Sequence, residues 1–352
     1  MSLTHLEDDY DHFYNPRFEV RLGNRTVREA EGVISGLTVE TGLDRTNRVS
    51  FTLNEPYDHE QGNFPGFADQ PVEKGVPVAV RMGYGDTLRH LFSGRVESVQ
   101  PNFPAEGGPT VEVSGNDPSQ AMTNGKRSRS WDGATLTTVV TDVASEYDFA
   151  GVAVELPQSV DLRFPKLVQH EQTDYDFLTD ELADAYGFEC FVREGVFHVR
   201  DPDPLAAPIL ELTYGESLRS FRPSGEDAEV RVGTVEVRDW DPGTKSAITA
   251  TASVPGGGQE RDERRAPVDS RREAELIAES IAFDLAPGIR GRAETIGLPE
   301  IREGRVVALG GLGGPFPGPY YVERTTHRMD RSGYTTSFEA RKANVFEGFS
   351  RL

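Results

Sequence analysis

The sequence predicts an α+β protein that is mainly β and contains two copies of one antiparallel β unit around a small α/β module. The 36 glycines and 23 prolines separate short runs of Val, Phe, Tyr and Thr, a pattern typical of strands joined by turns. Two distant regions repeat the same succession of strands, and the stretch between them has helical periodicity. With 352 residues, the chain is long enough for two or three domains with cores of their own.

The internal repeat is visible in the order of strands and turns, although the two copies share almost no identity. Each copy has a strand, a glycine-rich turn, a strand that opens on a glycine, a polar loop and an alternating strand. These segments are residues 75–85, 91–99 and 107–116 in front, and 304–313, 316–327 and 333–344 behind. The glycines that open the second strand are Gly94 and Gly318.

Each copy also has a further pair of candidate strands upstream, within residues 34–56 in front and 231–254 behind. Different excursions interrupt the two copies. Residues 57–73 read as an irregular loop, whereas residues 255–303 begin with a charged, flexible linker and continue into a helix. The two units are therefore expected to differ in what is inserted into them.

The helix of the second excursion is predicted because four apolar residues share one helical face: Ala274, Ile277, Ile281 and Leu285. The expected division of the chain has four parts: a tail (1–14), a first β domain (15–118), a middle α/β module (119–207) and a second β domain (208–347).

The middle module is expected to begin with a helix over residues 132–149, capped by Asp132. Its inward-facing residues are Leu136, Val139, Val140 and Val143.

A second helix of this module is expected to start at Thr173 and to end at Gly187, which suits a left-handed helix stop. Its buried face contains Leu178, Leu182 and Ala185. A hairpin should follow, with the two-residue turn Glu194-Gly195. In that register Glu189 lies opposite Arg200, and Cys190 faces a core together with Phe188, Val192, Phe197 and Val199.

Charge is the strongest feature of the composition. The chain has 58 acidic and 37 basic residues, a formal net charge of −21, and only five of the basic residues are lysines. Such a surface suits a salt-rich cytoplasm and indicates a halophilic origin, the alternative being an ordinary acidic protein. A chain this acidic has no basic face for general nucleic-acid binding.

The single cysteine, Cys190, excludes an intrachain disulfide and argues against a thiolate metal cluster. The N-terminal residues lack the apolar region of a signal peptide, and no apolar run is long enough for a membrane-spanning helix.

The acidic residues do not form a catalytic pattern. Asp180, Glu181 and Asp184 fall on the solvent side of the second helix, so a solvated face is the preferred interpretation over catalysis. His5 and His12 flank an acidic run without the spacing of a helical metal-ligand pair. There is no nucleophile motif, and no cofactor or metal ion is expected.

Two glycine-rich or basic segments have structural interpretations as well. Residues 310–318, GGLGGPFPG, lack the spacing of a phosphate loop and read as a turn between strands. Residues 125–131, GKRSRSW, form the one basic cluster and are interpreted as a salt-bridge patch between domains or subunits, with nucleic-acid binding as the alternative.

Three segments, in order, carry a resemblance: HEQTDYDFLTDELADAYGFECFVREGVFHV (170–199), VEVRDWDPGTKSAI (235–248) and EGRVVALGGLGGPFPGPYYVERTTHRMDRSGYTTSFEA (303–340). Residues 93–117 fit more weakly. The chain resembles the phage late control protein D family over roughly residues 15–345. Members of this family are baseplate hubs of contractile tails and related contractile injection systems, and they are similar to the hub portion of valine-glycine repeat spike proteins.

The resemblance implies two tube-like antiparallel β-barrel domains per chain and a homotrimer. Three chains would present six similar barrels to the sixfold inner tail tube on one face and a threefold spike on the other. Such a hub is a structural adaptor, not an enzyme. The chain ends at Leu352, which leaves no room for a spike, so a separate spike protein is expected as a partner, together with the tube protein and other baseplate proteins.

The residues expected to matter are structural. Gly94 and Gly318 would make close turns, and six further residues are candidate core or interface positions: Phe92, Val96, Val99, Tyr321, Val322 and Phe338. The protein should be cytoplasmic during assembly and then part of a virion tail or an injection particle. Two other functions remain open, a tail-borne hydrolase of the cell envelope and a β-rich carbohydrate-binding module.

Overall fold

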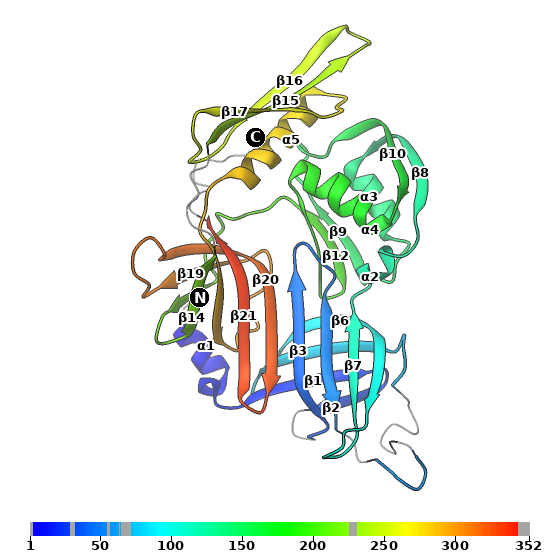
Figure 1. The fold of residues 1–352 in the computed structure, drawn as a ribbon, viewed down its shortest axis with the longest axis vertical. Helices are drawn as coiled ribbons and strands as arrows, with labels where there is room; N and C mark the ends of the chain where they lie inside the picture. The colour runs from blue at the N-terminus through cyan, green and yellow to red at the C-terminus, as the bar shows by residue number, and fades with distance from the viewer. Residues whose placement is uncertain are drawn as a thin grey trace.

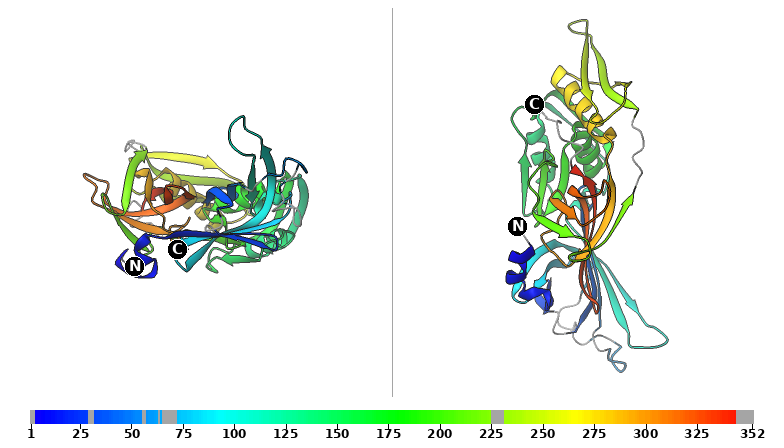
Figure 2. Two further views of the ribbon diagram at one scale, coloured as in Figure 1. Left: turned by 90° about the horizontal axis from the view of Figure 1, so that it is seen from below. Right: turned by 90° about the vertical axis from the view of Figure 1, so that its left-hand side faces the viewer.

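The computed structural model describes residues 3–28, 32–54, 57–62, 64, 72–224 and 231–343. Its central feature is a 13-stranded sheet that occupies the lower half of the molecule (Figure 1). The middle module and the helix-containing insertion both lie beyond one end of this sheet (Figure 1 and Figure 2). A mainly β, α+β fold is therefore confirmed.

The front part of the chain contributes seven strands to the sheet. These are β1 (Pro16–Leu22), β2 (Arg25–Arg28), β3 (Ile34–Gly42), β4 (Arg48–Leu53), β5 (Pro77–Tyr84), β6 (Thr87–Asn102) and β7 (Thr110–Asn116). They lie in the spatial order β3-β4-β7-β6-β5-β1-β2, and each adjacent pair is antiparallel.

The rear part contributes six strands. These are β13 (Leu210–Thr213), β14 (Leu218–Ser224), β18 (Arg290–Ile296), β19 (Val306–Gly310), β20 (Gly318–Asp330) and β21 (Gly333–Lys342). Their order, β14-β18-β21-β20-β19-β13, repeats the front order β3-β4-β7-β6-β5-β1 strand for strand. The duplication expected from the sequence is present in the structure. The two copies differ at their last pair, because β13 runs parallel to β19 whereas β1 runs antiparallel to β5.

The resemblance implied two closed β-barrels, and this expectation is wrong. Over the described residues the two units form one open sheet, because β20 pairs antiparallel with β3 from Arg324–Gly42 to Met329–Leu37. The physical reason is the length of β20. Its first residues pair with β19, and its later residues continue past the end of β19 and accept β3 on the same edge.

Residues 231–254 do form an antiparallel strand pair, as expected, but its assignment to the rear β unit is wrong. Strands β15 (Val232–Asp241), β16 (Ser246–Ser253) and β17 (Glu260–Arg265) form a separate sheet in the order β16-β15-β17. The true counterparts of β3 and β4 are β14 and β18. Alternating sequences look the same in either sheet, so local pattern could not identify the correct pair.

Helix α5 (Arg271–Leu285) covers this small sheet and confirms the helix predicted in the second excursion. Ser270 caps it by accepting a hydrogen bond from the backbone N–H of Glu273 at 3.1 Å. The side chains of Ala274, Ala278 and Ala282 are buried in the core it shares with the sheet. Small residues along this face allow the helix to lie close to the strands.

The middle module has a core of its own and contains more strands than expected. Its elements before the second helix are α2 (Ser119–Met122), β8 (Arg127–Thr135), α3 (Leu136–Ala144), β9 (Gly151–Glu155) and β10 (Arg163–Gln172). The four inward-facing residues of α3 are buried as expected. The expected cap is wrong: Asp132 lies within β8, and Thr135 accepts the hydrogen bond from Thr138 N that starts the helix.

The second helix starts at Thr173, whose hydroxyl accepts from Asp176 N at 3.1 Å. It runs through α4 (Asp174–Asp176), a π-helical segment η4 (Phe177–Ala183) and a 3-10 segment η5 (Asp184–Tyr186). Gly187 ends it in the left-handed conformation, with φ of 69°. Leu178 and Leu182 are buried, and Ala185 is half-buried.

The hairpin β11 (Glu189–Arg193) and β12 (Val196–Arg200) follows in the predicted register, with Glu189 opposite Arg200. Its turn is Glu194-Gly195, and both residues have positive φ. The five side chains expected on the core face are buried. On its other edge β12 pairs in parallel with β9, a strand that the sequence did not reveal.

The N-terminal residues do more than form a tail. Helix α1 (Leu3–Asp9) and a 3-10 turn η1 (Asp11–Phe13) precede β1, and the side chains of Leu6 and Tyr10 are buried in the core of the main sheet. Tyr10 donates to a carboxylate oxygen of Glu300 in the rear unit. The segment therefore links the front and rear parts of the chain.

Gly94 lies inside β6, which begins at Thr87, so the expectation that Gly94 opens its strand is wrong. A Cβ at Gly94 would lie 2.1 Å from the carbonyl oxygen of Asn116 in β7, so the two strands approach closely there. Gly318 does begin β20, with φ of +132°.

We expect Gly94→Ala to lower the free energy of unfolding by about 1 to 3 kcal/mol, because the added methyl meets backbone that cannot move cheaply. Urea unfolding at fixed salt measures the change. Gly108→Ala is the control, because a Cβ at Gly108 meets no atom within 4 Å. Equal stability of the two variants would contradict the close approach.

His327 is buried and neutral in the core of the rear unit. Its Nε2 donates to the carbonyl of Ile301 at 3.1 Å, and its Nδ1 accepts from Tyr334 or Thr336 at 2.9 and 3.1 Å. Burial and the nearby Arg302 guanidinium lower the pKa of His327 to about 3, from its usual 6.5.

Below pH 6.5 the unfolded chain binds a proton at His327, whereas the folded chain does not. The contribution of His327 to the free energy of unfolding is therefore complete above pH 6.5 and falls as the pH falls toward 3. Between pH 6.5 and 4.5, we expect the free energy of unfolding of the His327→Gln variant to fall by about 2 to 3 kcal/mol less than that of the wild type. Unfolding free energies across this range test it, with the exposed His170→Gln as control. An unchanged pH slope would count against a neutral buried His327.

Candidate functional site

The candidate site is the place where β3 of the front unit meets β20 of the rear unit. Thr41 on β3 and Thr325 on β20 face the core side of this pairing, and their hydroxyls are 2.8 Å apart. Thr41 also donates to the carboxylate of Glu303, which is fully buried. One carboxylate of the rear unit therefore contacts the edge strand of the front unit.

The hairpin of the middle module reaches into this junction. Arg193 Nε donates to Glu303 Oε1 at 3.3 Å, and the same guanidinium donates to the Glu303 backbone carbonyl. Asn47, in the loop between β3 and β4, donates to the carbonyl of Val192 at 2.7 Å. Burial lowers the pKa of Arg193, and the Glu303 carboxylate opposes that shift. The three parts of the chain are held by one buried ion pair and its hydrogen bonds.

A second polar cluster lies beside the first. Arg200 donates to Glu189 Oε2 at 3.1 Å and to the carbonyl of Gly304 at 2.8 Å, and Tyr321 of β20 donates to the other Glu189 oxygen. Burial raises the pKa of Glu189, while Arg200 acts to lower it. The cross-strand pair predicted within the hairpin thus also binds the hairpin to the rear unit.

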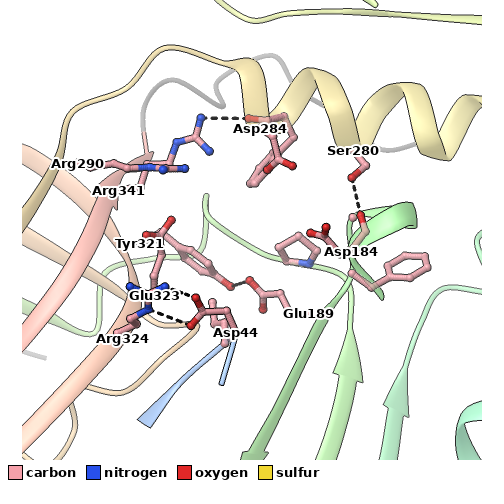
Figure 3. Close-up of a pocket in the computed structure, with 15 residues that line it drawn as sticks. Asp44, Asp184, Glu189, Ser280, Asp284, Arg290, Tyr321, Glu323, Arg324 and Arg341 are labelled. Atoms are coloured by element: carbon pink, nitrogen blue, oxygen red, sulfur yellow. Dashed lines mark hydrogen bonds and ion pairs between the residues drawn. The ribbon is translucent and has the colours of Figure 1, made fainter. Parts of the chain in front are cut away.

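A cavity of about 350 Å³ lies where the junction, α5 and the middle module meet (Figure 3). Arg324 donates to Asp44 Oδ1 at 2.9 Å on one wall, and Ser280 of α5 donates to the Asp184 carbonyl at 2.9 Å on another. Burial and then the Asp284 carboxylate raise the pKa of Asp184. The cavity is lined by residues of all three parts of the chain and is crossed by contacts between them, so it fits a joint between modules better than a ligand site.

Among the open edges of the main sheet over the described residues are one in each β unit, on β6 and on β14. In β6, residues Val96–Asn102 pair with β7 on one side and have no strand on the other, because β5 ends its pairing at Arg95. At the opposite end of the sheet, β14 pairs only with β18, apart from an isolated bridge at Leu218. These edges expose backbone hydrogen-bonding groups that can pair with another chain.

The structure distributes the eight residues singled out in the sequence over core and junction. Phe92, Val96, Val322 and Phe338 are buried in the main core, and Val99 is partly buried against it at the open edge of β6. Tyr321 is buried at the polar cluster with Glu189 and Arg200. Gly94 and Gly318 lie in β6 and β20.

The sequence did not reveal the residues that make the junction. Glu303 lies in a polar turn that precedes β19, and Arg193 lies next to the hairpin turn, so neither belongs to an apolar pattern that would indicate burial. Thr41 was an ordinary strand residue. Their roles arise only when strands nearly 300 residues apart are brought together.

The acidic residues of the second helix behave largely as expected. Asp180, Glu181 and Asp184 are exposed. Asp174 differs, because it is fully buried and accepts from Gln169 at 2.8 Å, Tyr147 at 2.6 Å and Arg129.

The basic cluster is a salt-bridge patch, but it lies within one module. Arg127 and Arg129 both pair with Glu146 and Asp174 of that module, not with another domain.

Two observations bear on metal and thiol chemistry in the part of the chain that the structure describes. No group of three or more His, Cys, Asp or Glu side chains there could hold a metal ion. Cys190 is buried, and burial raises the pKa of its thiol. No helix of the described residues is long and apolar enough to cross a membrane.

We expect Glu303→Gln to lower the free energy of unfolding by about 3 to 5 kcal/mol, because Arg193 keeps its buried charge and loses the opposite one. Lys74→Ala is the control. Lys74 precedes β5 as Glu303 precedes β19, and its ion pair with Glu97 is exposed, so a change below about 1 kcal/mol is expected. Urea unfolding compares the two, and similar losses would contradict a special role for the buried pair.

Comparisons with known proteins agree on the fold. The chain is similar to the 43 kDa tail protein of prophage MuSo2 from Shewanella oneidensis, with a TM-score of 0.70, 13% identity, and coverage of 94% of this chain and 99% of that one. It is similar to a tail protein from Neisseria meningitidis, with a TM-score of 0.72, 12% identity, and coverage of 94% and 98%.

A third similar chain belongs to the Francisella PdpA–VgrG complex, with a TM-score of 0.58 and 12% identity. The match covers 94% of this chain and 53% of that one. These likenesses confirm, at the level of the fold, the resemblance to baseplate hub proteins.

No curated protein matches the chain. A family model does, over residues 16–263, which is more than half of the sequence; its description is Alg8 N-terminal domain. The chain therefore belongs to the Alg8 N-terminal domain family, and its fold is that of phage tail proteins.

Proposed function

We propose that this protein is a structural hub adaptor that joins the sixfold inner tube of a contractile tail or injection system to its threefold spike. The observation that carries the proposal is the duplication. One chain contains two β units with the same strand order, so three chains supply six similar units. A trimer built in this way has threefold symmetry and an approximately sixfold ring.

The junction between β3 and β20 supports the ring. It shows that a front unit and a rear unit of this chain can join edge to edge in one continuous sheet. Each chain then has an open edge in each unit, the later residues of β6 in front and β14 behind, so copies can join head to tail. A ring of three chains contains six junctions, three within chains and three between them. The ring closes when each junction rotates one unit relative to the next by one sixth of a full turn.

The two ends of the molecule suit different partners. Both inserted parts, the middle module and the α5 insertion, lie beyond one end of the sheet, and the other end carries hairpins from both units (Figure 1). In a trimer the first end repeats three times, while the second end presents six similar hairpins. We assign the first end to the spike and the second to the tube.

In this proposal, residues 15–118 and 208–347 are the two ring units and residues 119–207 form the middle module. Gly94 permits a close strand approach, Val99 becomes an interface residue, and Phe92, Val96, Val322 and Phe338 hold the unit cores. Gly318 opens β20, and Tyr321 secures the module to the rear unit. The partners are two further copies of the chain, the tube protein, a separate spike protein and other baseplate proteins.

The hub needs no catalytic group, cofactor or metal ion. It would assemble in the cytoplasm and end in a virion tail or an injection particle. Its acidic, lysine-poor surface suits assembly in high salt, where screening reduces repulsion between copies.

Light scattering in high salt tests the proposal. We expect the chain, alone or mixed with the spike protein encoded beside it, to have three times the monomer mass, and this complex to bind tubes of the neighbouring tube protein. Glycan or peptidoglycan hydrolysis by the pure chain would instead favour a tail-borne hydrolase. A strict monomer in the presence of both partners would contradict the hub.

A further inference from the structure

We infer that β14 of one copy pairs antiparallel with the open edge of β6 in the next copy, with Ser224 opposite Gln100. This inference rests on the proposed hub and specifies its subunit contact. It follows from the internal repeat, because the chain already contains one example of the same kind of contact, the pairing of β3 with β20.

The first step is the equivalence of β6 and β20. Both strands carry a bulge at a glutamate that follows a valine, Val96-Glu97 in β6 and Val322-Glu323 in β20. The two valines make matching backbone bonds: Val96 O accepts from Gly75 N, and Val322 O accepts from Gly304 N, both at 2.7 Å. Counting on from the bulges makes Gln100 the counterpart of Thr326.

The second step is the equivalence of β14 and β3. In the front unit, Arg48 of β4 pairs with Asn116 of β7, which pairs with Arg95, the residue before Val96. In the rear unit, Arg290 of β18 pairs with Arg341 of β21, which pairs with Tyr321, the residue before Val322. Arg48 and Arg290 therefore occupy the same position.

Glu40 of β3 pairs with Arg48, and Ser224 of β14 pairs with Arg290. Ser224 is therefore the counterpart of Glu40.

The register follows directly. Within the chain, Thr326 lies opposite Glu40 and Arg328 lies opposite Thr38. Substituting the counterparts places Gln100 opposite Ser224 of the next copy. Two residues further along β6, Asn102 then lies opposite Arg222. The positions that would face Ser98 and Val99 lie outside the described residues.

Two features of the edges fit this contact. Strand β14 contains Arg222 and no acid, and Arg222 faces Asn102 in this register. Each copy has a formal net charge of −21, so a cation at this edge reduces the repulsion between copies.

The register also places Pro101 opposite Pro223. These two prolines are the counterparts of His327 and Val39, which lie opposite each other within the chain. Because proline has no N–H, this pair of prolines forms no backbone hydrogen bond, and the contact between chains is weaker than the one within the chain.

Proline on an open edge also discourages unspecific strand addition. The free chain can therefore remain soluble until a matching edge arrives. The partner that pairs with both edges at once, in the polarity seen between β3 and β20, is a second copy of this chain.

Cysteine cross-linking tests the register. Directly opposed residues in an antiparallel pair have Cα atoms about 4.5 to 5.5 Å apart, within the range of a disulfide. We expect oxidised Gln100→Cys/Ser224→Cys protein to give covalent dimers and trimers on a denaturing gel. Cys190 is buried and should not interfere.

Two double variants are matched controls. Glu40→Cys/Thr326→Cys places the same pair at the junction within the chain, so it should form a disulfide without any increase in mass. Gln100→Cys/Arg222→Cys is two residues out of register and should cross-link at least about tenfold less, because its Cα atoms are further apart.

A charge reversal gives a second, independent readout. Arg222→Glu should raise the dissociation constant of the trimer at least about tenfold at low salt, and less at high salt. Arg331→Glu, in the exposed turn between β20 and β21, should leave it unchanged.

The outcomes separate this inference from the hub. Suppose that the wild-type chain is a trimer. If Gln100→Cys/Arg222→Cys then cross-links efficiently, or Gln100→Cys/Ser224→Cys does not cross-link, the register is overturned and the hub stands. A wild-type chain that stays monomeric with spike and tube proteins overturns both. Cross-linking of the Gln100 and Ser224 pair alone supports the register.

Discussion

The antiparallel pairing of β3 with β20 is the contact on which the architecture depends. It joins strands whose facing threonines, Thr41 and Thr325, are 284 residues apart in the sequence. Ordering so long a segment costs conformational entropy, which the two unit cores and the shared sheet must offset. Once formed, the pairing turns two separate β units into one sheet that has an open edge in each unit.

The buried polar groups beside this pairing explain why the junction has one geometry. An apolar contact would tolerate sliding, but Glu303 must meet both Thr41 and Arg193, and Glu189 must meet both Arg200 and Tyr321. Buried ion pairs add little net stability compared with apolar packing, and breaking one is costly. We interpret these pairs as devices that fix the angle between the units, the quantity that decides whether a ring closes.

The same molecule keeps its two ends distinct. The inserted parts cover one end of the sheet and contact the junction through the middle-module hairpin, so they stiffen it as well as extend it. Their own cores make them separate folded bodies on a shared sheet. In the proposed hub, a duplicated unit with different insertions would present approximate sixfold symmetry at one end and threefold symmetry at the other.

The sequence by itself determined what is local. The caps at Thr173 and Gly187, the turn at Glu194-Gly195, the face of α3 and the repeated strand order are written in spacing and residue type, because neighbouring residues decide them. Only the tertiary structure decided which strands become partners. Residues 231–254 alternate like a rear sheet pair and belong to another sheet, and Glu303 is buried by contacts with β3 and Arg193, which are distant in the sequence. Strand pairing depends on free edges and matching lengths far apart in the chain, which no local pattern records.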